Sequence, residues 1–248
     1  MGGWRNRLSS FCPEVIRSKK LMDLGLFERV IEQVAPITEQ VSFHLMGEPL
    51  VHPKFETMVD ICVKNKVPIN LVSNGVLLNE KRAQMLLHPQ FRQVNFSIHS
   101  FPDNFPEKDP TEYLEKIFQF TERAFAERPD LYINFRLWNL QSPRETLAKK
   151  NQEILAMIEN RFQWKMPEPK VDVREQKSLK IKNRLYLHFD TEFTWPSLDL
   201  PIIGERGFCH GLSGHFGILA DGTVVPCCLD KEAKIPLGNV ADQPVLEI

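Results

Sequence analysis

The chain has 248 residues, 31 basic and 32 acidic side chains and a formal net charge of -1, with 42% hydrophobic and 25% charged residues. This balance is ordinary for a folded globular protein and excludes a disordered chain or one that relies on a basic excess to bind nucleic acid. No apolar stretch reaches membrane-spanning length and the N-terminal residues lack the apolar core of a secretory signal, so we expect a cytoplasmic protein without nucleic-acid or membrane partners.

Short apolar runs alternate with helical stretches through most of the chain. The spacing of apolar residues predicts a first helix over residues 23–34. The runs that follow it are strand-length and rich in β-branched or aromatic residues. These predicted strands are 41–46, 69–73, 94–98 and 131–137. The predicted helices between and after them are 54–65, 79–87, 110–127 and 144–160.

The four strand starts lie 28, 25 and 37 residues apart, which is the spacing of successive βα units. Such units predict a parallel sheet, either a barrel or a doubly wound sheet, with functional groups at the carboxyl ends of the strands. The polar stretch 163–184 predicts a surface connection or an edge element, and residues 185–189 predict a further strand. From about residue 204 we expect a small β appendage, with a hairpin whose turn, Asp221-Gly222, is typical of type I′.

Small or polar residues follow three of the predicted strands and occupy the fourth. They are Gly47, Glu48 and Pro49 after the first strand, Ser73 and Asn74 after the second, Ser97 at the end of the third and Arg136 within the fourth. Glycine permits close approach of a ligand to the backbone, and a neighbouring carboxylate can bind an ammonium group. Such residues are also common in turns, and Arg136 is equally consistent with a salt-bridged strand residue. Together they predict a site for a polar, nucleoside-sized ligand.

The five cysteines are unsuited to a disulfide framework, because their number is odd and two are adjacent. Cys62 lies between apolar residues of a predicted helix, so we expect it in the core. Cys12 precedes Pro13 ahead of the first helix. A single cysteine is weak evidence for a metal, since buried free cysteines are common.

The other three cysteines, Cys209, Cys227 and Cys228, flank the predicted hairpin. Thiolates that converge on a small β unit favour zinc or an iron–sulfur cluster. A zinc site would recruit His210 or His215 as well. The alternative is a cysteine-rich turn without metal, which is disfavoured because so small a unit buries little core.

The order of Cys12-Pro13, the run from Met46 to Pro53, Val72-Ser-Asn-Gly75 and Phe96-Ser-Ile98 resembles that of radical S-adenosylmethionine (SAM) enzymes. Twelve residues separate Cys209 from Gly222 and four separate Gly222 from Cys227. This spacing, with Leu237-Gly-Asn-Val240 beyond it, resembles the start of a SPASM or twitch domain, a type that carries auxiliary iron–sulfur clusters. The resemblance covers about residues 9 to 248.

The resemblance implies an α/β fold, a partial (β/α)6 TIM-like barrel over residues 9–203 that lacks its first strand, followed by a truncated SPASM-like iron–sulfur region over residues 204–248. It also implies a [4Fe-4S] cluster that receives an electron from a flavodoxin or ferredoxin and cleaves SAM reductively. The resulting 5′-deoxyadenosyl radical abstracts hydrogen from a substrate, and a peptide is the expected class.

The same resemblance implies roles for the strand-end residues. Gly47, Glu48 and Pro49 would hold the methionine end of SAM, with Ser73 and Asn74 beside them. Ser97 would contact the ribose or the carboxylate, and Arg136 would supply a further contact. The implied metal ligands are Cys12, Cys209, Cys227 and Cys228.

The N-terminal cluster motif departs from the family pattern. Three thiolates in a Cys-x3-Cys-x2-Cys loop leave one iron open for SAM, and Cys12 fits the third position. Ser9 and Arg5 occupy the other two positions and supply no thiolate. We therefore expect a chain that is truncated at both ends, or a member that lost its cluster, and in either case one that does not hold the SAM-cleaving cluster stably. The alternative function is a non-catalytic SAM-binding or zinc-stapled module.

Overall fold

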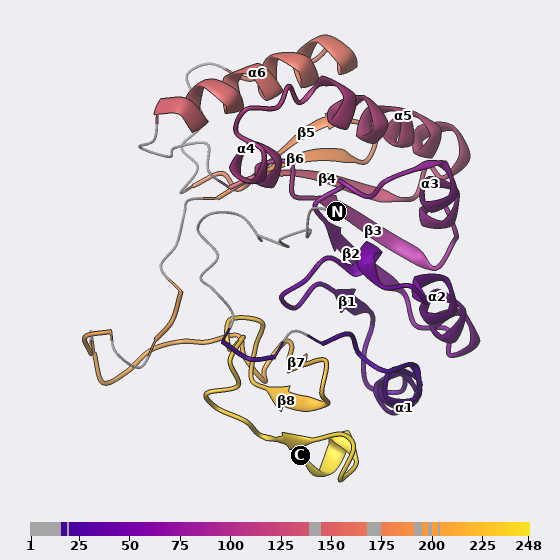
Figure 1. Ribbon diagram of the computed structural model, residues 1–248, viewed down its shortest axis with the longest axis vertical. Coiled ribbons are helices and arrows are strands. Elements are labelled where there is room, and N and C mark those ends of the chain that lie inside the picture. Colours follow the sequence, from indigo (N-terminus) through magenta and orange to yellow (C-terminus); the bar gives the residue numbers. More distant parts are fainter. Residues whose placement is uncertain are drawn as a thin grey trace.

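A six-stranded sheet with helices packed along it forms the larger part of the chain (Figure 1). The computed structural model describes residues 16–18, 20–138, 145–167, 175–190, 195–197, 200–202 and 204–248. The helices of the described residues are α1 (Leu24–Val34), η1 (Pro49–Val51), α2 (Phe55–Lys64), α3 (Glu80–Leu86), α4 (Ser100–Asn104), α5 (Thr111–Glu127), α6 (Glu145–Phe162) and, near the C-terminus, η2 (Val245–Glu247). None of these described helices has the length and apolar composition needed to cross a membrane.

The strand order of the large sheet is that of an incomplete barrel. Its strands are β1 (Val41–Phe43), β2 (Ile69–Ser73), β3 (Phe91–Phe96), β4 (Tyr132–Leu137), β6 (Leu185–Phe189) and β5 (Ser178–Lys182), in that spatial order. Neighbours from β1 to β6 are parallel, and β5 pairs antiparallel with β6 at the edge. The order runs in one direction without the reversal of a doubly wound sheet. The predicted α/β partial barrel is confirmed, and β5 is the edge element predicted within 163–184.

Most predicted bounds agree with the structure, but two strands differ. β1 ends three residues early, because the chain turns before Met46, whose backbone has φ +56°. β3 begins three residues early because fully buried Phe91 pairs with Ile69 of β2. The short helix α4 was not predicted, since its five residues contain a proline and no helical repeat.

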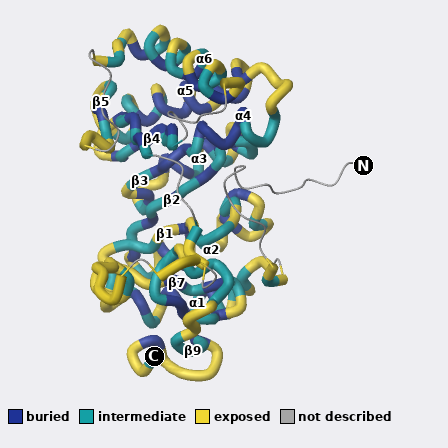
Figure 2. Tube along the Cα trace, turned by 90° about the vertical axis from the view of Figure 1, so that its left-hand side faces the viewer, coloured by how far each residue is buried: buried dark blue, intermediate teal, exposed yellow. Residues whose placement is uncertain are grey.

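Aromatic contacts join the helices to one face of the sheet. On α5, the Phe120 ring lies 5.6 Å from Phe96 and the Phe118 ring lies 6.0 Å from Phe135. Phe162 at the end of α6 lies 6.0 Å from the same Phe135 ring. Figure 2 shows many residues of β2, β3 and β4 as buried, below α5 and α6 in this view. Because side chains alternate along a strand, the intervening residues point to the opposite face.

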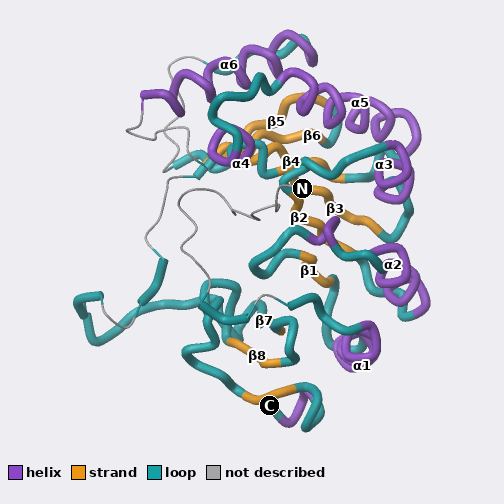
Figure 3. Tube along the Cα trace, in the orientation of Figure 1, coloured by secondary structure: helices purple, strands orange, loops and turns teal. Residues whose placement is uncertain are grey.

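The C-terminal unit, defined as residues 204–248, packs on α1. Its small antiparallel sheet contains β7 (Gly217–Ile218), β8 (Thr223–Val225) and β9 (Gly238–Asn239). Val224, Val240 and Val245 form one apolar cluster with Val30 and Val34 of α1. Figures 1 and 3 show the corresponding arrangement, with this sheet beside α1 and β1. The predicted appendage is therefore docked on the first helix of the larger sheet domain.

The predicted hairpin is present, but its turn is not type I′. A type I′ turn requires positive φ at two central residues, whereas Gly222 (φ +88°) is the one residue between β7 and β8 with positive φ. The Gly222 amide donates to the Leu219 carbonyl at 2.9 Å, and the Leu219 amide donates to the Thr223 carbonyl at 2.9 Å. These bonds define a three-residue loop that ends in a left-handed glycine, a second common hairpin solution.

Candidate functional site

The carboxylate of Glu48 joins the ends of β1 and β2. Its Oε1 accepts hydrogen bonds from the Ser73 hydroxyl at 2.9 Å and the Leu50 amide at 3.1 Å. Its Oε2 accepts the Asn74 amide at 2.6 Å. Burial raises the pKa of Glu48, while these three donors and the charge of Arg82 oppose the rise. The structure thus brings the predicted residues Glu48, Ser73 and Asn74 into direct contact.

Arg82 and Tyr113 support this junction and were missed by sequence reasoning. The Arg82 guanidinium donates to the Leu50 carbonyl at 3.1 Å and the Leu77 carbonyl at 2.8 Å, which ties the loops after β1 and β2 together. The Tyr113 hydroxyl donates to the Asn74 carbonyl at 2.7 Å. Burial, with a smaller effect from Glu48, raises the pKa of Tyr113. Neither residue stands near a strand end in sequence, so the motif gave no signal for them.

The turn after β2 is fixed by its own side chains. Ser73 Oγ accepts the Gly75 amide at 3.0 Å, and Asn74 Oδ1 accepts the Val76 amide at 2.9 Å. Gly75 has φ +72°, and a Cβ built there would lie 2.9 Å from Ile117 Cδ1. The turn therefore needs glycine for both its backbone and its packing.

We expect Gly75→Ala to destabilise the fold by about 2 kcal/mol, because alanine pays for the left-handed conformation and must also displace Ile117. Chemical denaturation measures the loss. Gly207→Ala is the matched control, because among the described residues no atom other than those of its chain neighbours lies within 4 Å of the Cβ position there. A loss at Gly75 no larger than that of the control would contradict the assigned role of the turn.

Gly47 leaves open space at the end of β1. It is exposed, and no described atom beyond its two chain neighbours lies within 4 Å of the position that a Cβ would take. Met46 before it has φ +56°, and Pro49 after Glu48 begins the short helix η1. Together these features turn the backbone so that Gly47 is exposed beside the anchored carboxylate of Glu48.

Ser97 lies beside the Ser73 turn through the backbone, because its amide donates to the Ser73 carbonyl at 2.8 Å. The Ser100 hydroxyl donates to the Ser97 carbonyl at 2.6 Å. His99 is buried, and its Nδ1 donates to the Arg136 carbonyl at 2.9 Å, since a carbonyl only accepts. Burial lowers the pKa of His99 to about 4. His99 thus joins the ends of β3 and β4 as a neutral imidazole.

Arg136 points away from the helices, on the face opposite to Phe135 and Leu137. Its guanidinium carbon lies 5.0 Å from the centre of the Trp138 ring. The buried Nε of Arg136 has no hydrogen-bond partner in the described part of the chain. Burial lowers the pKa of Arg136 to about 10, so the guanidinium stays charged at neutral pH. A buried donor without a partner fits a ligand oxygen at this position.

A chain of amides lines the same face deeper in the sheet and was also missed. Asn95 Nδ2 donates to Asn70 Oδ1 at 2.8 Å and to the Leu71 carbonyl at 2.9 Å. Its Oδ1 accepts from Asn134 Nδ2 and Gln93 Nε2, both at 2.8 Å. Asn95 is fully buried and all its hydrogen-bonding capacity is used. The sheet face that carries Arg136, called the open face here, therefore has a polar floor: the hydrogen-bonded amides of Asn70, Gln93, Asn95 and Asn134.

The C-terminal cysteines differ in exposure. Cys209 is exposed, and its Sγ accepts the Gly211 amide at 3.2 Å, whereas Cys227 and Cys228 are half-buried. Burial raises the pKa of the Cys228 thiol, and the neighbouring Cys227 raises it further. The positive charge of Arg136 opposes this rise. Within the described residues, no three His, Cys, Asp or Glu side chains are grouped to hold a metal. Metal binding by these cysteines stays a prediction.

The remaining two cysteines have separate outcomes. Cys62 is fully buried in the main apolar cluster, and burial raises its pKa to about 12, so the core prediction is confirmed. Cys12 lies outside the described residues. Arg5 and Ser9, at the other two positions of the expected cluster loop, carry no thiolate. The residues present therefore do not fit a [4Fe-4S] cluster held by three cysteines.

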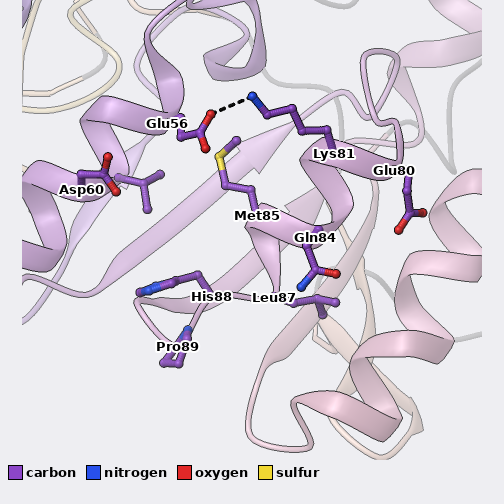
Figure 4. Close-up of a pocket in the computed structure, with 10 residues that line it drawn as sticks. Glu56, Asp60, Glu80, Lys81, Gln84, Met85, Leu87, His88 and Pro89 are labelled. Carbon is purple, nitrogen blue, oxygen red and sulfur yellow. Dashed lines mark ion pairs between the residues drawn. The ribbon is translucent and has the colours of Figure 1, made fainter.

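A hollow of about 640 Å³ lies between α2 and α3, apart from the strand ends (Figure 4). Its lining residues are Glu56, Val59, Asp60, Glu80, Lys81, Gln84, Met85, Leu87, His88 and Pro89. The Lys81 ammonium pairs with the Glu56 carboxylate at 2.8 Å across it. None of the predicted ligand-binding residues lines this hollow.

Solved structures with the same fold include three proteins of low sequence identity. BtrN in complex with AdoMet and 2-DOIA has a TM-score of 0.53 at 16% identity, over 98% of this chain and 76% of that one. Native anSMEcpe with bound AdoMet and Kp18Cys peptide has a TM-score of 0.57 at 16% identity, over 96% and 75%. Streptococcus suis SuiB bound to precursor peptide SuiA has a TM-score of 0.57 at 14% identity, over 97% and 61%.

Family patterns match both parts of the sequence. The SPASM pattern, an iron–sulfur cluster-binding domain, matches residues 209–248, and the radical SAM pattern matches residues 8–149. A comparison with curated proteins gives no match. The second pattern covers more than half of the sequence and includes the Glu48 junction, so the chain belongs to the radical SAM superfamily.

Proposed function

We propose that the chain binds SAM at the carboxyl ends of β1 to β4. The residues assigned to this site are Gly47, Glu48, Pro49, Ser73, Asn74, Ser97 and Arg136. The observation that carries the proposal is the anchored carboxylate of Glu48 next to the open backbone of Gly47. A carboxylate has about four acceptor positions and three are used here, so one is left for the ammonium group of SAM.

Arg136 complements Glu48 in charge. SAM carries a carboxylate and ribose hydroxyls besides its ammonium group, and the unpartnered Nε of Arg136 is a donor for such oxygens. Ser97 directly follows β3, the strand between β2 and β4. The arrangement suits a zwitterionic ligand, with an acceptor at one end and a charged donor at the other.

The C-terminal cysteines are proposed to hold an auxiliary iron–sulfur cluster. Cys209 and Cys227 belong to the matched SPASM segment, and adjacent Cys228 is a third thiolate. With only Cys12 in the N-terminal loop, we propose that the chain as it stands does not hold the SAM-cleaving cluster stably. A peptide is the proposed substrate class, because two similar folds, anSMEcpe and SuiB, have been solved with peptides. A flavodoxin or ferredoxin is the proposed electron donor.

Anaerobic reconstitution with iron and sulfide tests both metal assignments. We expect the wild-type chain to take up iron and sulfide, and Cys227→Ala with Cys228→Ala to lose most of both, because these thiolates are the proposed ligands. Cys12→Ala should change little. Iron and sulfide analysis with electron paramagnetic resonance gives the readout. Cys62→Ala is the control, since the buried Cys62 thiol cannot reach a cluster.

Two outcomes contradict this assignment in different ways. A site-differentiated [4Fe-4S] signal that vanishes in Cys12→Ala but persists without Cys227 and Cys228 would show that the N-terminal cluster does assemble. A stoichiometric zinc content without sulfide would replace the auxiliary cluster by a zinc site that involves His210 or His215.

The second candidate function is a non-catalytic SAM-binding module, favoured by the arginine and serine at positions 5 and 9. Calorimetry with iron-free protein separates it from an impaired enzyme. SAM binding that survives without iron favours the module, because the protein side chains then supply the affinity. Binding that requires iron favours the enzyme.

A further inference from the structure

The C-terminal unit holds the start of the described chain through one carboxylate. Glu232 Oε1 accepts the Ile16 amide at 3.0 Å, and Glu232 Oε2 accepts the Arg17 amide at 3.1 Å. Two successive backbone amides are thus bound by both oxygens of a side chain that lies more than 200 residues later. Figure 1 shows this first segment beside the C-terminal unit.

A second carboxylate holds the same residue from another loop. The Arg17 guanidinium forms an ion pair with Asp221, the residue before the left-handed glycine of the β7–β8 turn. The side chains of Arg17 and Asp221 are 28% and 36% exposed, so the pair is partly shielded from water. Backbone and side chain of Arg17 are therefore held by two separate segments of the C-terminal unit.

Glu232 is unusually buried for an ionised surface residue. Its side chain is 12% exposed, and that of its ion-pair partner Lys231, at 2.7 Å, is 11% exposed. A buried carboxylate is costly unless it is paired and hydrogen-bonded. Lys231 and the amides of Ile16 and Arg17 supply these partners, so the N-terminal segment completes the environment of Glu232.

The loop that carries Glu232 continues directly from the cysteine pair. The Asp230 amide donates to the Cys227 carbonyl at 3.2 Å. The carboxylate of Asp230 accepts the Lys234 amide at 2.7 Å and the Ile235 amide at 2.9 Å, which closes the loop around Glu232. The position of Glu232 is thus fixed relative to Cys227.

We propose that Glu232, assisted by Asp221, is a positioning residue that fixes the exit of the N-terminal segment on the C-terminal unit. Ile16 and Arg17 lie ahead of α1, which packs on the same unit through Val30 and Val34. The C-terminal unit thereby restrains both α1 and the described residues that precede it.

Amide hydrogen exchange of a peptide that spans residues 16 and 17 tests the proposal without any metal. In Glu232→Ala we expect exchange there to be roughly tenfold faster or more, because both amides lose a charged acceptor. Glu232→Gln keeps one carbonyl oxygen as an acceptor, so its exchange rate should lie between those of the wild type and Glu232→Ala. Asp242→Asn, which changes an exposed carboxylate of the same unit, is the control.

Asp221→Asn gives an independent variant should Glu232→Ala unfold the C-terminal unit, and it should also speed exchange at Arg17. Unchanged exchange in Glu232→Gln and Asp221→Asn, with the unit folded by circular dichroism, would overturn the proposal. Iron that depends on Cys227 and Cys228, measured as in the reconstitution experiment, is read separately. Its absence from the wild type would contradict the proposed auxiliary cluster, while faster exchange still supports the positioning by Glu232.

Discussion

Replacing Glu48 by alanine is expected to raise the dissociation constant for SAM by at least about tenfold and to lower stability by about 3 kcal/mol. The stability loss follows from three donors, the Ser73 hydroxyl and the amides of Leu50 and Asn74, which all lose their acceptor. The affinity loss follows from removal of the only proposed acceptor for the ammonium group. Calorimetry and chemical denaturation measure the two effects.

Glu48→Gln separates charge from hydrogen bonding and adds a pH test. Burial raises the pKa of Glu48, so the folded state favours the protonated form more than the unfolded state does. Its contribution to stability is therefore full at low pH and is lost as the pH rises through the raised pKa. SAM binding has the opposite dependence, because the ammonium needs the carboxylate. We expect wild-type affinity to fall as the pH is lowered from neutral toward that pKa, and Glu48→Gln to be weak and flat.

The control for Glu48 is Glu39→Ala. The Glu39 side chain is 94% exposed and pairs with Arg92 at 4.0 Å, so its loss should change stability by less than about 0.5 kcal/mol and leave SAM affinity unchanged. If Glu48→Gln binds SAM as tightly as the wild type across this pH range, the carboxylate does not contact the ammonium. The hydrogen bonds of Glu48 would then stabilise the loops after β1 and β2 without forming part of a binding site.

The parallel sheet was predictable because each βα unit is encoded locally. Apolar runs such as Ile69–Ser73 and the helical spacing that buries Phe27 and Ile31 do not depend on distant contacts. The Glu48 junction was predictable in part, because the ends of parallel neighbours meet at one edge of the sheet. This rule predicts that Glu48, Ser73 and Asn74 lie close together, and their hydrogen bonds confirm it.

Residues that act across sequence separation gave no such signal. Tyr113 supports the Asn74 turn from the first turns of α5, 39 residues later in the chain, and it resembles an ordinary core aromatic. Asn95 and Asn134 fall in strands that otherwise alternate as expected, and only the cross-strand register puts them opposite each other. Register and tertiary contact, rather than local propensity, determine these roles.

The C-terminal unit shows the same limit. Asp221-Gly222 correctly predicts a tight hairpin, but the choice between two loop geometries depends on which residues pair across it. The contact of Glu232 with Ile16 joins opposite ends of the sequence, so no local pattern could indicate it. The part of the molecule that links its two ends was therefore the least predictable.

Asn95→Leu is expected to destabilise the fold by about 3–4 kcal/mol, even though leucine is apolar and similar in size. Asn95 satisfies Asn70, the Leu71 carbonyl, Asn134 and Gln93. A leucine removes these bonds and leaves the Leu71 carbonyl and Asn134 buried, and Asn70 and Gln93 half-buried, without them. Each buried polar group that loses its partner costs on the order of 1–3 kcal/mol, while the apolar gain is small. The free energy of unfolding in denaturant measures the sum.

Asn95→Asp tests whether the floor of amides depends on the direction of its hydrogen bonds. The Asn95 amide group faces two acceptors, Asn70 Oδ1 and the Leu71 carbonyl, so a carboxylate oxygen in its place meets only repulsion. Burial should raise the pKa of the new carboxyl, and the loss of stability should then grow as the pH rises through that pKa. Asn160→Leu on the exposed side of α6 is the control and should cost less than about 0.5 kcal/mol. Equal stability of Asn95→Asp and the control at neutral pH would mean that the direction of the Asn95 hydrogen bonds does not stabilise the sheet. The amide network would then not explain how Arg136 is supported.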